Sequence, residues 1–185
     1  MRNIPNYITV GRLLTLPILV ALMMADTFWT SWLALGIYTF GCITDWLDGY
    51  IARRYKVVSP FGQFLDPIAD KIFILTVLIT LIANHHVQGM WIVPIILILS
   101  REFLIAGLRE FLGPKNIQIP VTQLAKWKTG FQMGSLGFLI VGEHGKIIYP
   151  IAIETGLFLL LVATALTIIT GWGYFREGLK HVEQP

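Results

Sequence analysis

The chain has few charged residues and a single cysteine. Only 14% of its 185 residues are Asp, Glu, Lys or Arg, whereas soluble domains carry about 25%. A hydrophobic content of 55% and a mean hydropathy of +0.69 therefore indicate an integral membrane protein. The single cysteine, Cys42, excludes an intramolecular disulfide and is most simply a small packing residue.

Long apolar runs take the place of the missing charges. A helix needs about 20 residues to cross a bilayer, and six runs of that order are found at 8–25, 29–50, 66–87, 90–112, 124–142 and 149–174. The connections between them are short and contain helix-breaking residues. We therefore predict an all-α polytopic membrane protein with six transmembrane helices, forming one domain over residues 1–185. Residues 1–12 predict a short N-terminal interfacial helix, retained rather than cleaved.

The basic residues predict the orientation in the membrane. With the N-terminus in the cytoplasm, twelve of the 14 Lys and Arg residues lie at or near the inner face, and only Lys146 lies clearly outside. Both termini are then cytoplasmic. The net charge of +3 reflects this topology and attraction to anionic lipids. A nucleic-acid partner is not expected, because the sequence shows no basic face with exposed aromatic residues. His85 and His86 are predicted to lie in a solvated outer turn.

Four aspartates stand out in the stretch DWLDGYIARRYKVVSPFGQFLDPIAD, residues 45–70. Asp45 and Asp48 are three apart near the end of the second predicted span, and Asp66 and Asp70 are four apart at the start of the third. Residues three or four apart share one face of a helix. The intervening cytoplasmic loop would let the two pairs face each other, although an ionised carboxylate at membrane depth is costly unless it is partnered.

Four neighbouring carboxylates remain ionised only when cations or protons join them. Oxygen ligands without His or Cys favour Mg²⁺ or Mn²⁺, and two such ions would suit a diphosphate undergoing in-line displacement. Asp66 before Pro67 also fits a helix N-cap, which is the simpler interpretation of that one residue. A cation or proton transporter is a further alternative, but transporters usually place charges at the midplane between repeats.

The same stretch resembles the signature of the CDP-alcohol phosphatidyltransferase family. The matching pattern is Asp45-x-x-Asp48-Gly49-x-x-Ala52-Arg53, eight residues, then Gly62-x-x-x-Asp66-x-x-x-Asp70. The resemblance implies a six-helix membrane enzyme, usually a homodimer, which transfers a phosphatidyl group from CDP-diacylglycerol to an alcohol and releases CMP. It implies two bound metal ions with ligands at Asp45, Asp48 and Asp66, and Asp70 as general base that also touches metal. The residues it implies for the cytidine diphosphate pocket are Gly49, Ala52, Arg53 and Gly62.

Two arginines of the fourth predicted span could serve a phosphorylated acceptor. Arg101 and Arg109 are eight residues apart, which places them about 80° apart around a helix, so both can point into one cavity. Glu102 and Glu110 leave a structural ion pair open as an alternative. Lys126 and Lys128 diverge around their helix, so at most one should reach the same cavity.

Three further segments resemble the bacterial phosphatidylglycerophosphate synthase branch of that family: NIPNYITVGR, SREFLIAGLREFL and KWKTGFQM. This resemblance implies sn-glycerol 3-phosphate as acceptor and a location in the bacterial cytoplasmic (inner) membrane, with the active site facing the cytoplasm. It implies that Arg101, Arg109 and Lys126 hold the acceptor phosphate. Asn6, Thr9 and Arg12 match the segment that caps the active site, where Asn6 and Thr9 would contact CDP-diacylglycerol. Enzymes that use serine or inositol phosphate share the core signature, so these acceptors remain alternatives.

Overall fold

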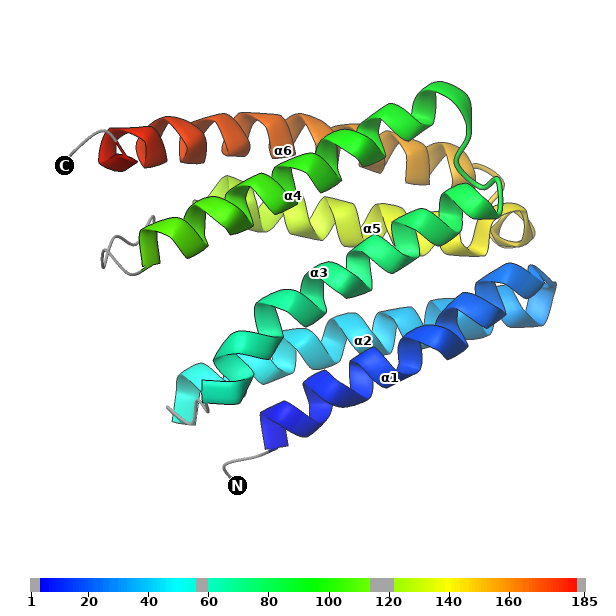
Figure 1. The fold of residues 1–185 in the computed structure, drawn as a ribbon. Helices are drawn as coiled ribbons and strands as arrows, with labels where there is room; N and C mark the ends of the chain where they lie inside the picture. The colour runs from blue at the N-terminus through cyan, green and yellow to red at the C-terminus, as the bar shows by residue number, and fades with distance from the viewer. Residues whose placement is uncertain (1–3, 56–59, 114–121, 183–185) are drawn as a thin grey trace. The chain divides into compact units, whose positions relative to one another are not determined.

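The computed structural model describes the backbone of residues 4–55, 60–113 and 122–182, and most side chains between residues 9 and 176 (Figure 1). Within these ranges the regular structure is entirely helical, as predicted. A short 3₁₀ helix, η1 (Gly89–Trp91), precedes the fourth helix. The six α-helices are α1 (Ile4–Ala25), α2 (Phe28–Tyr55), α3 (Pro60–Ala83), α4 (Ile92–Leu112), α5 (Gln123–Gly145) and α6 (Ala152–Val182).

The start of α3 differs from the prediction. The helix begins at Pro60, and Pro67 lies inside it, so the interpretation of Asp66 as an N-cap is wrong. A proline suits the first turn of a helix because its missing N–H would be unpaired there in any case. Pro60 and Pro67 carry the same local signal, and the chain uses the earlier one.

The N-terminal segment also differs from the prediction. Residues 4–12 are the beginning of α1 and not a separate interfacial helix, because the helix runs unbroken from Ile4 to Ala25. Pro5 is tolerated in the first turn. Arg12 is therefore carried on the same rigid helix as the apolar residues that follow it.

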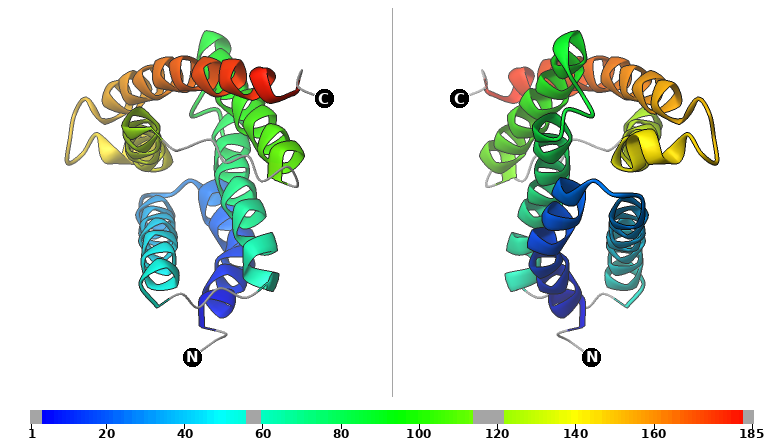
Figure 2. Two further views of the ribbon diagram at one scale, coloured as in Figure 1. Left: turned by 90° about the vertical axis from the view of Figure 1, so that its left-hand side faces the viewer. Right: turned by 90° about the vertical axis from the view of Figure 1, so that its right-hand side faces the viewer.

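Two compact units make up the chain, and the first contains residues 1–87 and 136–153. In this unit α1 packs against both α2 and α3 (Figures 1 and 2). The Tyr38 and Phe73 rings stack with centroids 5.7 Å apart, which joins α2 to α3. A Cβ on Gly41 would lie only 2.8 Å from Phe73, so this glycine makes room for the ring.

The second unit contains residues 88–135 and 154–185, and so holds η1, α4, the first part of α5, and most of α6. The buried Ser135 hydroxyl donates to the Gly156 carbonyl at 2.8 Å, which ties α5 to α6. Ile95, Ile98 and Leu160 are fully buried in this unit. Its core therefore lies along α4 and α6.

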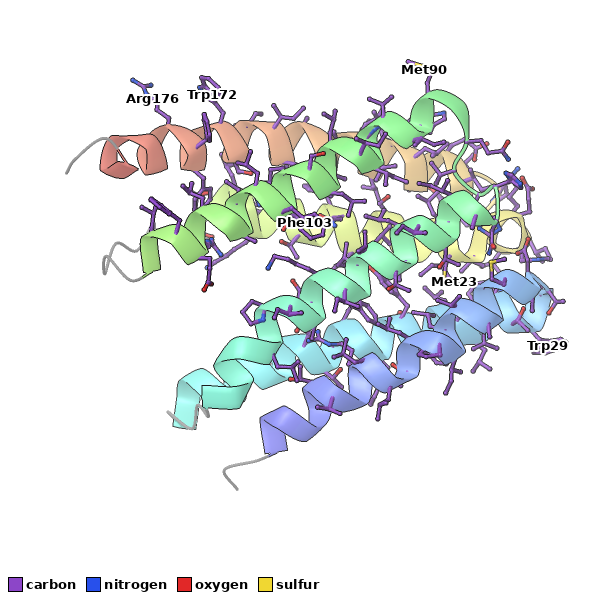
Figure 3. The ribbon with its side chains drawn as sticks, in the orientation of Figure 1. Met23, Trp29, Met90, Phe103, Trp172 and Arg176 are labelled. Atoms are coloured by element: carbon purple, nitrogen blue, oxygen red, sulfur yellow. The ribbon has the colours of Figure 1, made fainter. Side chains whose placement is uncertain are left out.

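Large apolar side chains cover much of the outer surface. Trp29, Met90 and Trp172 are 78%, 81% and 68% exposed, and all three project away from their helices (Figure 3). Two stretches, Gly89–Leu112 and Ala152–Arg176, are long and apolar enough to cross a membrane, and Thr9–Ala25 is a shorter apolar helix. These helices are consistent with membrane association.

A kink in α5 holds a polar cluster in the first unit. Gly142 has φ 52° and ψ −131°, and a Cβ there would lie 2.9 Å from the His86 ring. His86 Nδ1 lies 2.8 Å from the Leu139 carbonyl oxygen, and His86 Nε2 lies 3.3 Å from Asp26 Oδ1. The His86 side chain is only 12% exposed, so the predicted solvated turn is wrong for His86, whereas His85 is exposed.

We expect Gly142→Ala to destabilise the protein. The backbone angles of Gly142 are nearly restricted to glycine, which costs other residues on the order of 1–3 kcal/mol, and the new methyl group would also collide with His86. Thermal unfolding of the detergent-solubilised protein measures the loss. Gly130→Ala in the same helix is the control, because a Cβ at Gly130 meets nothing within 4 Å. Equal stability of the two variants would contradict the described kink.

Candidate active site

The aspartate pairs lie on two helices of the first unit. α2 carries Asp45 and Asp48, and α3 carries Asp66 and Asp70. Helical spacing places the members of each pair on one face. The side chains of Asp48 and Asp66 lie outside the described part of the structure, so the contacts below concern Asp45 and Asp70.

Asp45 forms an ion pair with Arg12, which reaches it from α1. The Arg12 side chain is only 5% exposed, and its guanidinium carbon lies 5.9 Å from the centroid of the Phe73 ring. A guanidinium this buried needs a carboxylate partner. Arg12 thus belongs directly to the carboxylate site, where the sequence assigned it only to a capping segment.

Cys42 lies on α2, three residues before Asp45. The thiol lies within electrostatic range of Asp45, Asp70 and Arg12, and it hydrogen-bonds the Tyr38 side chain. Asp70 also acts electrostatically on Tyr38 and is itself half-buried. The charges of Asp45 on α2 and Asp70 on α3 therefore both act on the same stretch of α2. That the two aspartate pairs face each other stays a prediction.

Carboxylates are the ligands that Mg²⁺ and Mn²⁺ prefer, so the four aspartates together would suit a hard divalent cation. Among the residues whose side chains are described, no three His, Cys, Asp or Glu side chains are close enough together to hold a metal ion. The fit therefore depends on Asp48 and Asp66 joining Asp45 and Asp70.

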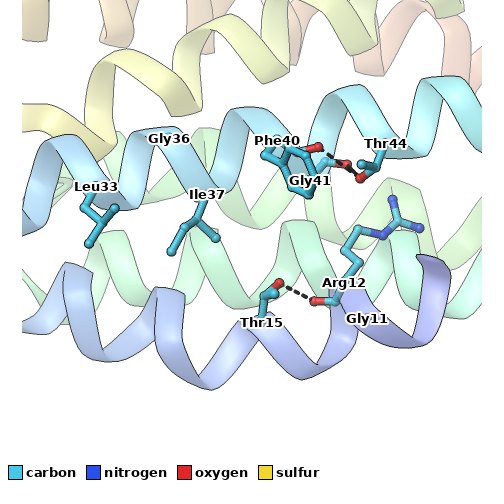
Figure 4. Close-up of a pocket in the computed structure, with 9 residues that line it drawn as sticks. All are labelled: Gly11, Arg12, Thr15, Leu33, Gly36, Ile37, Phe40, Gly41 and Thr44. Atoms are coloured by element: carbon cyan, nitrogen blue, oxygen red, sulfur yellow. Dashed lines mark hydrogen bonds between the residues drawn. The ribbon is translucent and has the colours of Figure 1, made fainter. Parts of the chain in front are cut away.

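A cavity opens between α1 and α2 beside this site (Figure 4). Its volume is about 550 Å³, and Arg12 extends from α1 toward α2 at one end of it. The residues lining the cavity are mainly small or apolar: Gly11, Arg12, Thr15, Leu33, Gly36, Ile37, Phe40, Gly41 and Thr44. The cavity is suited to a hydrophobic ligand with a polar end.

The residues assigned to CDP-diacylglycerol lie on the same three helices. Thr9 on α1 is 1% exposed, and Gly62 on α3 is buried. The other four occupy helical positions but have side chains outside the described part: Asn6 on α1, and Gly49, Ala52 and Arg53 on α2.

In the second unit, Arg101 and Arg109 of α4 share one aromatic ring. Their guanidinium carbons lie 5.6 Å and 5.3 Å from the centroid of the Tyr174 ring on α6. Arg109 Nη2 also donates to the Tyr174 hydroxyl at 3.3 Å. The structure thus brings the two arginines together, but through a tyrosine that the sequence analysis did not select.

Glu102 forms ion pairs beside these arginines. Glu102 Oε1 accepts from Arg101 Nη1 at 3.1 Å and from Lys128 Nζ at 2.5 Å. The ion pair that the sequence left open for Arg101 is therefore present. Lys128 is the lysine that enters this cluster, with a side chain only 7% exposed, whereas Lys126 is exposed.

Comparisons with known proteins agree over nearly the whole chain. A family model described as CDP-alcohol phosphatidyltransferase matches residues 2–170. A Rickettsia typhi protein named CDP-diacylglycerol–glycerol-3-phosphate 3-phosphatidyltransferase is 42% identical, over 95% of this chain and 97% of its own length. A Cereibacter sphaeroides protein of the same name is 37% identical, over 98% of this chain and 97% of its own. A rice protein named cardiolipin synthase (CMP-forming) is 33% identical over 95% of this chain and 57% of its own length.

Proposed function

This chain belongs to the CDP-alcohol phosphatidyltransferase family, and we propose that it transfers the phosphatidyl group of CDP-diacylglycerol to sn-glycerol 3-phosphate. The products are phosphatidylglycerol phosphate and CMP. The main support is the complete acidic segment of residues 45–70, in a chain similar over 95% of its length to a relative with that named activity.

The reaction is an in-line displacement at phosphorus. The acceptor hydroxyl oxygen attacks the phosphorus that carries diacylglycerol, the bond from that phosphorus to the CMP oxygen breaks, and CMP leaves. Asp70 takes the hydroxyl proton as general base. Two Mg²⁺ or Mn²⁺ ions, held by Asp45, Asp48, Asp66 and Asp70, would neutralise the diphosphate and the charge developing on CMP.

Arg12 has a positioning role in this proposal. Its buried ion pair fixes the Asp45 carboxylate with respect to α1. A carboxylate held in one orientation is a better metal ligand than one that must be ordered on binding. Arg12 on α1 would thereby help to keep the metal ligands in place.

Other residues have the roles that the family pattern gives them. Arg101, Arg109 and Lys126 hold the phosphate of the acceptor. The cytidine diphosphate and its lipid contact Asn6, Thr9, Gly49, Ala52, Arg53 and Gly62.

The setting of the enzyme is also a proposal. All six helices cross the bacterial cytoplasmic (inner) membrane, both termini and the active site face the cytoplasm, and residues 1–185 act as one catalytic domain within a homodimer. The abundance of exposed apolar side chains on the described helices supports burial in lipid.

An acceptor assay tests the proposed function. Detergent-solubilised protein receives CDP-diacylglycerol and Mg²⁺ with one candidate acceptor at a time, and release of CMP is followed. We expect release with glycerol 3-phosphate and little with serine, inositol or inositol 1-phosphate. If phosphatidylglycerol, added as a further acceptor, were the one acceptor that gave CMP, the result would favour a second candidate function. This candidate is a cardiolipin synthase, the activity named for the rice relative.

We expect Asp45→Asn, Asp48→Asn and Asp66→Asn each to raise the Mg²⁺ concentration needed for half-maximal activity. Each variant removes one negative charge from the ligand set, and the expected shift is about tenfold or more. Mg²⁺ titration of CMP release measures it. Asp26→Asn, which changes an aspartate in the cluster around His86, is the control. An unchanged Mg²⁺ requirement in all three variants would contradict the two-metal proposal.

A further inference from the structure

The side of α6 that faces Arg101 and Arg109 packs closely against their side chains. Thr170, Gly171 and Tyr174 contact them, and all three residues are buried. Thr170 Oγ1 lies 3.4 Å from Arg101 Nη2. A Cβ on Gly171 would lie 2.9 Å from Arg101 Cγ. Glycine at this position is therefore needed for the path that the arginine takes along α6.

Tyr174 holds the ends of both arginines. It is 3% exposed, and its ring faces the guanidinium groups at 5.6 Å and 5.3 Å. A guanidinium over an aromatic face is stabilised by the ring quadrupole, more strongly where water is excluded. Two like charges can thus be kept near each other before any anion arrives.

The two arginines differ in what they have left to offer. Arg101 is 13% exposed and already bonds Glu102 and Thr170. Arg109 is exposed, and Tyr174 accepts one of its N–H groups. A guanidinium has five N–H donors. Arg109 can therefore bind an incoming anion while its Nη2 group keeps the hydrogen bond to the Tyr174 hydroxyl.

The charge of the cluster favours a phosphate. Arg101 and Lys128 share one carboxylate, Glu102, and Arg109 adds a third positive charge on the other side of the Tyr174 contact. The excess positive charge is partly buried, and phosphate oxygens pair with guanidinium groups through charge-assisted hydrogen bonds. A monoanionic or neutral acceptor would leave more of this charge uncompensated.

We infer that Tyr174 is a positioning residue for the acceptor: it pre-orders Arg109 beside Arg101 and so sets the preference for a phosphorylated alcohol. Pre-ordering matters because an unrestrained arginine loses rotamer freedom when it binds. Gly171 completes the arrangement by letting Arg101 lie against α6. The inference rests on the proposed function, since it concerns the acceptor of that reaction.

Steady-state kinetics of Tyr174→Phe and Tyr174→Leu test this role. We expect Tyr174→Phe, which keeps the ring, to raise the KM for glycerol 3-phosphate only about two- to threefold. Tyr174→Leu, which loses ring and hydroxyl, should raise it about tenfold or more. The KM for CDP-diacylglycerol should change in neither variant. Trp172→Leu, a bulky aromatic change on the outer side of α6 (Figure 3), is the matched control and should leave both KM values unchanged.

A second measurement separates this inference from the proposed function. Inorganic phosphate is titrated into the detergent-solubilised protein by calorimetry, with and without the substitutions. We expect weaker binding in Tyr174→Leu and in Gly171→Ala, and near-native binding in Tyr174→Phe. Unchanged phosphate binding and an unchanged acceptor KM in Tyr174→Leu would overturn the role of the tyrosine. Phosphate binding that weakens in Tyr174→Leu, in a protein that releases no CMP with glycerol 3-phosphate, would overturn only the proposed function.

Thermal unfolding shows which variants remain folded, and so separates a loss of acceptor binding from a loss of structure. If Tyr174→Leu does not fold, Gly171→Ala and Tyr174→Phe still vary the arginine positions in graded steps. Losses of equal size in both substrate KM values, across variants that remain folded, would mean that the tyrosine serves the fold and not the acceptor.

Discussion

Asp70→Asn is expected to abolish turnover, lowering the rate of CMP release on the order of 10³-fold, while CDP-diacylglycerol binding stays within about tenfold. An amide cannot take the proton from the acceptor hydroxyl, but it keeps the size of the side chain and one oxygen. Asp70 is half-buried, and an amide of the same size keeps the packing around it. Single-turnover CMP release and competition binding of the donor measure the two quantities separately.

The Mg²⁺ dependence distinguishes a base from a ligand at this position. In the variants of Asp45, Asp48 and Asp66, high Mg²⁺ should restore part of the activity. In Asp70→Asn it should not, because a missing proton acceptor is not replaced by more metal. Full recovery of Asp70→Asn at high Mg²⁺ would make this residue a metal ligand only and would leave the base to be found elsewhere.

The order and type of the helices could be read from the sequence, but several of their ends could not. The membrane spans were predicted from runs of apolar residues, whereas a helix can continue through polar residues as long as its backbone hydrogen bonds form. The predicted second span stopped at residue 50, yet α2 runs to Tyr55 through Arg53 and Arg54. The helix macrodipole favours cations in the last turn of a helix, so these arginines suit a helix end as well as a loop.

The local part of the site was predictable and the long-range part was not. The spacing of the aspartates fixes which of them share a helix face, because that depends on neighbours within one turn. The pairing of Arg12 with Asp45 joins residues 33 apart in the chain, and that of Arg109 with Tyr174 joins residues 65 apart. No periodicity within one segment reports such contacts. The buried surroundings of His86, which lies after the end of α3, likewise depend on the backbone of Gly142 in α5.

The choice between Lys126 and Lys128 shows the same limit. Two lysines two residues apart point in different directions, so the sequence allowed only one of them into the arginine cluster. The contact of Lys128 with Glu102 depends on how α5 packs against α4. Lys126 is exposed, and its role as an acceptor ligand stays a prediction.

Arg109→Ala is expected to reduce kcat/KM for glycerol 3-phosphate roughly 30- to 1,000-fold, without changing the KM for CDP-diacylglycerol. This corresponds to a loss of about 2 to 4 kcal/mol of transition-state stabilisation. The substitution removes an exposed guanidinium whose orientation is fixed by Tyr174. A phosphate in a partly desolvated cluster then loses charge-assisted hydrogen bonds and part of its compensating charge. Lys126→Ala is expected to cause a loss in the same direction. Initial rates over a matrix of donor and acceptor concentrations separate the two substrates.

Two controls make this result specific for the phosphate. Arg109→Lys should recover only part of the lost activity, because an ammonium group cannot offer a planar pair of donors to two phosphate oxygens. Glycerol should be a poor acceptor for the native protein, and its low rate should be nearly the same in Arg109→Ala, because the phosphate that Arg109 would bind is missing. Equal losses with glycerol and glycerol 3-phosphate would mean that Arg109 serves the fold or the donor, so the acceptor would have to be recognised by other residues.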